Sequence, residues 1–225
     1  MYMAMALRYY TIFLSVVIVI FASVIHELAH AYTAYRLGDD TAKREGRLTL
    51  NPLKHLDPVG SLALPVLMGI MGGPVFAYAK PVPYNPFKLR NPKRDEVLVA
   101  LAGPVSNLIL ALVGGAIFRV ILSAFGSPAS YDAVFWVLTS ISTFVYVNLV
   151  LLFFNLIPIP PLDGSKVVLY FLGDEQRQSY YQLQRYAMVI LIIALYLIPQ
   201  ILHLDPVGMY LNVTAGNLAD LILGI

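Results

Sequence analysis

The chain of 225 residues has no cysteine and few charged residues. Without cysteine it cannot form disulfides, thiolate metal sites or cysteine nucleophiles. Charged residues make up 12% of the chain and apolar residues 59%, whereas soluble domains contain about 25% charged residues. The net charge of +2 gives nucleic acid no electrostatic reason to bind. We therefore predict a protein that lies in a lipid bilayer and has no nucleic-acid partner.

Long stretches without any charged residue divide the chain into membrane segments. These stretches are 9–25, 58–79, 97–118, 133–162 and 186–204, and each is about long enough to cross a hydrocarbon core. A signal peptide is the alternative for the first stretch, but no small-residue cleavage site closes it. We predict an α-helical polytopic membrane protein with about four to six membrane segments, organised as one domain over 1–225. The predicted spanning helices cover about 9–35, 96–120, 133–157 and 184–204.

The stretch 58–79 differs from the others because it is rich in residues that interrupt a helix. Five Lys or Arg residues lie in 36–54 before it and five lie in 80–94 after it. Positively charged loops stay in the cytoplasm, so both flanks should lie on the same side of the membrane. We predict a re-entrant, partly extended hairpin over about 58–85, which must pack against protein or line a wet cavity. Its helix-interrupting residues are Pro65, Gly69, Gly72, Gly73 and Pro74.

The first predicted span contains the motif His26-Glu27-Leu28-Ala29-His30. On a helix, His26 and His30 lie one turn apart on one face, so both imidazoles can bind one metal ion. Glu27 projects beside them and can take a proton from a water on the metal. Two buried histidines satisfied by hydrogen bonds are the alternative, but this leaves an ionisable Glu unexplained in an apolar helix. We predict a zinc site with Glu27 as the general base.

Catalytic zinc needs a third protein ligand and keeps one position open. Asp163 is the best candidate, because it is the first charged residue after the long uncharged stretch 133–162. The prolines before it break the helix and leave an extended segment that can turn a carboxylate inward. A helix cap or a turn at Asp-Gly is the alternative role. The acidic residues Glu45, Glu96 and Glu175 lie in charged loops and are less suitable ligands.

These motifs resemble the site-2 proteases, a family of intramembrane zinc metalloproteases. The resemblance covers roughly residues 20 to 170 and fits a small prokaryotic type without a PDZ or nucleotide-sensing domain. It implies hydrolysis of a peptide bond within or next to a transmembrane helix of a membrane protein substrate, in regulated intramembrane proteolysis. It also makes Asn155, His55 and Asn107 candidates for transition-state or substrate contacts. The stretches that carry it are 26–30 with 155–164, then 51–60, 79–83 with Asn85, and 102–107.

A membrane metal transporter, or a zinc-binding membrane protein without protease activity, is the alternative from another functional class. A transporter would distribute polar ligands along several spans instead of grouping them beside a general base. For the protease, the resemblance implies a prokaryotic cell membrane, and the charge pattern predicts an active site nearer the cytoplasm. An unwound substrate needs backbone partners, which an extended edge of the enzyme could supply. The candidate edges are 41–50 and 75–80.

Overall fold

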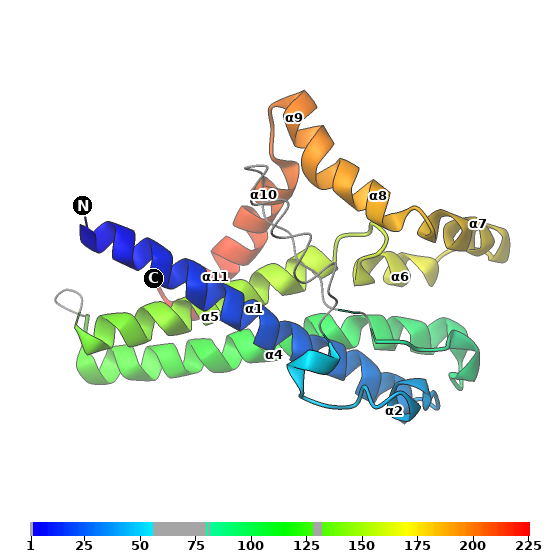
Figure 1. The fold of residues 1–225 in the computed structure, drawn as a ribbon, viewed down its shortest axis with the longest axis horizontal. Helices are drawn as coiled ribbons and strands as arrows, with labels where there is room; N and C mark the ends of the chain where they lie inside the picture. The colour runs from blue at the N-terminus through cyan, green and yellow to red at the C-terminus, as the bar shows by residue number, and fades with distance from the viewer. Residues whose placement is uncertain (1, 56–79, 81, 128–131) are drawn as a thin grey trace.

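The computed structural model describes residues 2–55, 80, 82–127 and 132–225 (Figure 1). Its framework consists of three long helices, α1 (Tyr2–Arg36), α4 (Pro92–Phe125) and α5 (Ala133–Asn155). Figure 1 shows these helices side by side, with α1 crossing over α4 and α5. At 1.5 Å per residue, each of them is long enough to cross a hydrocarbon core of about 30 Å. The described residues contain three such apolar helices, or four if one bent pair counts as a single span.

Local sequence signals set the ends of these helices. Pro92 occupies the first turn of α4, where a missing N–H costs nothing. Asp95 accepts a hydrogen bond from the Asn91 N–H at 2.9 Å and so satisfies a free donor at that end. Asp132 does the same for α5 by accepting from the Phe135 N–H at 2.8 Å. At its other end α4 stops at Gly126, whose φ of 73° favours glycine.

Short elements connect and cover this framework. Two of them, α2 (Thr41–Arg44) and the 3-10 turn η1 (Pro52–Lys54), follow α1, and the turn η3 (Pro86–Lys88) precedes α4. After α5 the chain forms α6 (Asp163–Leu169) and α7 (Asp174–Gln184). The remaining C-terminal elements are α8 (Ala187–Ile192), the π-helical turn η4 (Ile193–Leu197), α9 (Ile198–Leu202), α10 (Pro206–Leu211), the π-helical turn η5 (Asn212–Gly216) and α11 (Asn217–Leu223).

The largest core cluster lies between α4, α5 and the C-terminal elements. Small residues reach full burial there, as Ala111 on α4 and Ala215 in η5 show with 0% exposure. Small side chains let helix backbones approach closely, which is how helices associate in lipid. α11 packs against both α4 and α5, and Arg119 on α4 donates to the carbonyls of Leu221 and Ile222 at its end. The C-terminal helix is therefore held at the end of α4 that lies far from α2.

The architecture confirms the predicted fold class and adds one finding about its last predicted span. The helical stretch 187–201 lies within the predicted span 184–204, and a bend of 75° separates it from residues 175–184, which precede that span. The re-entrant hairpin predicted over about 58–85 lies largely outside the described residues. Of the two candidate edges, 41–50 is not a strand, because it begins with the helix α2. The other, 75–80, also lies outside the described residues except for Lys80.

Candidate metal centre

Three side chains that can bind metal converge where α1 passes the start of α6. Asp163 Oδ2 lies 3.1 Å from His26 Nε2 and 3.2 Å from His30 Nε2. One donor atom from each residue falls within 4.8 Å of the others. The side chains are 8%, 11% and 9% exposed for His26, His30 and Asp163, so the cluster is shielded from bulk solvent. The structure thus brings together the three residues that the sequence indicates as ligands.

The outer nitrogens of both rings are engaged in hydrogen bonds that fix the tautomer. His30 Nδ1 donates to the Val99 carbonyl at 2.6 Å, and a carbonyl can only accept. His26 Nδ1 donates to Asn107 Oδ1 at 2.6 Å. Each ring therefore keeps its Nε2 turned toward the Asp163 carboxylate, where an unprotonated Nε2 can bind a metal ion. Two imidazole nitrogens and one carboxylate oxygen are a donor set that suits Zn²⁺ and leaves a fourth position open.

A chain of buried amides supports His26 from the side opposite Asp163. Asn107 on α4 and Asn148 on α5 are both fully buried. Asn107 Nδ2 donates to Asn148 Oδ1 at 3.0 Å, and Asn148 Nδ2 donates to the Phe144 carbonyl at 2.9 Å. Every link has one donor and one acceptor, so the orientation of the imidazole is set by the packing of α4 against α5. Sequence reasoning missed Asn148, although an amide in an uncharged span was a signal for an interhelical bond.

Gly103 on α4 faces the two rings directly. A Cβ at this position would meet the Nε2 atoms of both His26 and His30. The space in front of the ligand atoms is therefore kept free by the absence of a side chain. Because α4 approaches α1 at this glycine, it also brings the Val99 carbonyl to His30 one turn earlier. This stretch of α4 can lie against the histidines because Gly103 has no side chain and because the Val99 carbonyl accepts from His30.

The segment after α5 brings Asp163 to the histidines. Prolines at 158, 160 and 161 prevent the helix from continuing past Asn155. The chain then turns and starts α6 at Asp163, whose neighbour Gly164 packs against the Leu156 backbone. A Cβ at Gly164 would collide with that backbone, so this close approach requires glycine. Asp163 is the first residue of α6 and not its cap, since the N-cap is Leu162 and no side chain makes a cap hydrogen bond, and its carboxylate faces the histidines.

Glu27 lies half-buried on the same turn of α1 as the two histidines. Its Oε2 accepts a hydrogen bond from the Val82 N–H at 2.8 Å. Val82 belongs to the stretch that leads to η3, and Asp39 holds the same stretch by accepting from the Asn85 N–H at 2.6 Å. The carboxylate is thus fixed through one oxygen beside the ligands. Its other oxygen can accept a proton.

The remaining candidates lie in different surroundings. Asn107 contacts His26 and is buried, so it reaches the site only through the ring that it orients. Asn155 donates from Nδ2 to the Leu151 carbonyl of its own helix at 3.0 Å. His55 is 1% exposed and its Nε2 bonds the Thr49 carbonyl at 2.8 Å. No described contact joins Asn155 or His55 to the cluster, and their roles toward substrate stay predictions.

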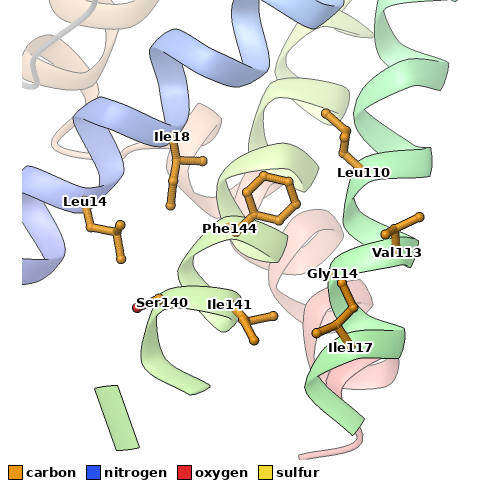
Figure 2. A pocket seen from close by; sticks show the side chains of 9 residues that line it. All are labelled: Leu14, Ile18, Leu110, Val113, Gly114, Ile117, Ser140, Ile141 and Phe144. Carbon is orange, nitrogen blue, oxygen red and sulfur yellow. The ribbon is translucent and has the colours of Figure 1, made fainter. Parts of the chain in front are cut away.

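An apolar hollow of about 360 Å³ lies between α1, α4 and α5 (Figure 2). Ile18 and Leu14 enter it from α1, Leu110 from α4, and Phe144 from α5. Its lining contains no His, Asp or Glu, and its polar residue Ser140 already bonds the Tyr10 hydroxyl. The hollow offers nothing that could bind a metal or activate water. The candidate active site is therefore the cluster of His26, His30 and Asp163.

The structure has helices that are long and apolar enough to span a membrane, and a candidate metal centre at one of them with Glu27 beside it. Comparison with known proteins agrees with this class. The model of peptidase family M50 matches residues 121–198. "Putative zinc metalloprotease YwhC" of Bacillus subtilis is 38% identical over 195 residues, which cover 87% of this chain and 82% of that protein. "Putative zinc metalloprotease Rip2" of Mycolicibacterium smegmatis is 36% identical over 174 residues, which cover 76% of this chain and 62% of that protein.

No solved structure matches the chain. The extent and identity of the similarity to the Bacillus subtilis protein nevertheless establish the family. The chain belongs to peptidase family M50, the site-2 proteases. It is an integral membrane protein and a zinc metalloprotease that acts on protein substrates.

Proposed function

We propose that the protein is an intramembrane endopeptidase, which hydrolyses a peptide bond within or next to a transmembrane helix of another membrane protein. In this proposal His26, His30 and Asp163 hold the zinc and Glu27 is the general base. The observation that carries it is the convergence of two imidazole Nε2 atoms from the membrane-spanning helix α1 with one carboxylate oxygen from the start of α6. Histidine ligands on such a helix favour a substrate that itself lies in the membrane.

When bound, zinc supplies a Lewis acid that polarises the scissile carbonyl and makes water acidic enough to react near neutral pH. The chain supplies the rest of the chemistry. Glu27 takes a proton from the attacking water through its unbound carboxylate oxygen and returns that proton to the leaving amine. The Val82 N–H keeps the carboxylate in place during both transfers. Gly103 leaves the space in which a substrate carbonyl can approach the ligands.

We also propose that the site lies nearer the cytoplasmic face of the cell membrane. His30 is six residues from Arg36, where α1 ends. The same end of the molecule carries the basic residues of 36–54 and 80–94, which favours the cytoplasmic side. A site at this depth can receive water from the cytoplasm and can release a cleaved domain into it. Release of a membrane-held protein is the outcome that regulated intramembrane proteolysis requires.

The experiment that tests the proposal replaces Glu27 by Gln in the purified protein. Glu27→Gln has nearly the same size and still accepts from the Val82 N–H, but it cannot take a proton. We expect one zinc per chain in both proteins and a loss of turnover of at least a hundredfold in the variant, measured on a single-span membrane protein. His26→Ala serves as the contrasting variant, because it should lose zinc and turnover together.

Cleavage by Glu27→Gln at the wild-type rate would show that the base is wrong. Wild-type protein that moves zinc across a vesicle membrane and cleaves no membrane-spanning helix would show that the protein is a transporter. Cleavage restricted to soluble peptides would contradict the intramembrane substrate while leaving the zinc chemistry intact. These readouts separate the mechanism from the choice of substrate.

A further inference from the structure

Lys166 is a mostly buried cation beside the metal centre that the proposed chemistry does not use. It lies one turn after Asp163 on α6, and its Nζ is 3.9 Å from Asp163 Oδ1. Its side chain is 19% exposed. A lysine that only serves solubility extends its ammonium group into water, whereas this one turns it toward the carboxylate.

The two oxygens of Asp163 face different partners. Oδ2 points at the Nε2 atoms of His26 and His30, at 3.1 and 3.2 Å. Oδ1 is the oxygen that Lys166 approaches. A carboxylate that binds a metal through one oxygen keeps a second oxygen that must be satisfied, especially when it is buried. If the carboxylate can rotate, its second oxygen can become another metal ligand. It then occupies the coordination position that a catalytic zinc site keeps open for water.

The ammonium group of Lys166 is held in place from its other side by an aromatic ring. Nζ lies 4.9 Å from the centre of the Tyr84 ring, within the range of a cation–π interaction. The Tyr84 hydroxyl donates to Glu96 Oε1 at 3.1 Å. Burial and the neighbouring Glu96 carboxylate raise the pKa of Tyr84 far above its usual range, so this hydroxyl remains a donor. Arg177 and Tyr181 of α7 fix the other Glu96 oxygen, Oε2, each at 3.3 Å.

We propose that Lys166 is a positioning residue that holds Oδ1 of Asp163, so that the carboxylate presents only Oδ2 to the metal. The inference rests on the proposed ligand set of the preceding section. Lys166 touches neither substrate nor metal. It acts through Asp163, and Tyr84 acts through Lys166. The polar cluster of Glu96, Arg177 and Tyr181 then links the geometry of the metal centre to α4 and α7.

The test measures metal binding instead of activity alone. Zinc affinity is determined by competition with a chromogenic chelator, and the protein loaded with Co²⁺ is examined by visible absorption. A four-coordinate Co²⁺ site absorbs several times more strongly than a five- or six-coordinate one, so the spectrum reports whether Oδ1 has joined the metal. We expect Lys166→Met to lower zinc affinity about tenfold, as the loss of a partner behind a ligand does, and to weaken the Co²⁺ absorption severalfold.

Lys166→Arg should restore both readouts because it returns a cation to the same place, which a merely space-filling role would not require. Lys88→Met is the matched control: it removes another lysine that pairs with an aspartate, Asp40 at 3.4 Å, away from the metal centre. It should leave affinity and spectrum unchanged. Lys166→Gln gives a second neutral variant if Lys166→Met does not fold.

Wild-type affinity and an unchanged Co²⁺ spectrum in the folded neutral variant would overturn the role of Lys166. That result is distinct from failure of the ligand set itself. If the ligand set is wrong, the wild type holds no zinc, or His26→Ala and Asp163→Ala retain it. If only the positioning role is wrong, these alanine variants lose zinc while Lys166→Met keeps it at wild-type strength.

Discussion

At the scale of single residues, the metal centre depends on atoms that do not bind the metal. His26 and His30 can serve as the proposed ligands because their Nδ1 atoms donate to Asn107 and to the Val99 carbonyl. Both acceptors come from α4, so one helix orients both rings. An imidazole without such a partner can rotate, which moves Nε2 away, or change its tautomer, which protonates Nε2. Either change takes the Nε2 lone pair from the site.

Replacing Asn107 by Ala should therefore weaken zinc binding while the ligands themselves remain. The change leaves the His26 Nδ1–H and Asn148 Oδ1 without their partners in a fully buried place. We expect an affinity for zinc that is lower by about 10- to 100-fold in a chelator competition assay. Asn155→Ala is the control, because that amide bonds only the Leu151 carbonyl of its own helix among its described contacts. Equal zinc affinity in the two variants would contradict the orienting role.

The sequence indicates the proposed ligands, but it does not indicate the groups that orient them. The spacing of His26 and His30 places them on one face of a helix. A carboxylate directly after a long apolar stretch is unusual, and this indicates Asp163 as the third ligand. The acceptor for His30 is a backbone carbonyl, which carries no residue identity at all. Asn107 was a candidate for a substrate contact, but its link to His26 spans 81 positions and depends on how α4 packs against α1. Pairings of this kind follow from tertiary packing.

At the scale of elements, uncharged stretches locate the long helices well. Charge and hydropathy predict α1, α4 and α5, because a helix in lipid must be apolar along its length. They do not predict the bend after α7, since hydropathy reports length and not direction. Nor do they predict the C-terminal helix α11, because the stretch 217–223 is short and its place depends on contacts with α4 and α5.

Arg119 should be a main anchor of α11. Its guanidinium donates to the Leu221 and Ile222 carbonyls, which lack partners within the helix because they lie at its end. A cation there also favours the negative end of the helix dipole. We expect Arg119→Leu to destabilise the docked helix by roughly 1 kcal/mol, so amide hydrogen exchange within 217–223 should be about fivefold faster.

Arg8→Leu is the matched control for this change. Arg8 is an exposed arginine on α1 and carries the same charge. Its replacement should leave exchange in α11 unchanged. Equal exchange rates in Arg119→Leu and wild type would mean that apolar packing alone holds the helix.

At the scale of the whole molecule, the ends of the long helices divide into a basic end and a nearly uncharged one. α1 enters the basic end at Arg36 and α4 leaves it at Pro92. The connection between them is tied together there, since the Arg90 N–H donates to the Leu37 carbonyl at 3.1 Å. At the opposite end, where α1 begins and α4 passes to α5, the described helices carry two basic residues, Arg8 and Arg119. Positive charge on one side is the usual mark of the cytoplasmic face.

Cysteine labelling can test this orientation cleanly because the chain has no cysteine of its own. Single cysteines at Asp40, Arg90 and Ser127 each occupy a surface position of a described segment. We expect a membrane-impermeant maleimide to label position 127 from outside intact cells, and positions 40 and 90 only after the membrane is opened. The contact between 37 and 90 requires the last two positions to behave alike, whatever path the chain takes between them. Labelling of 40 and 90 from opposite faces would contradict both the fold at this end and a metal centre close to the cytoplasm.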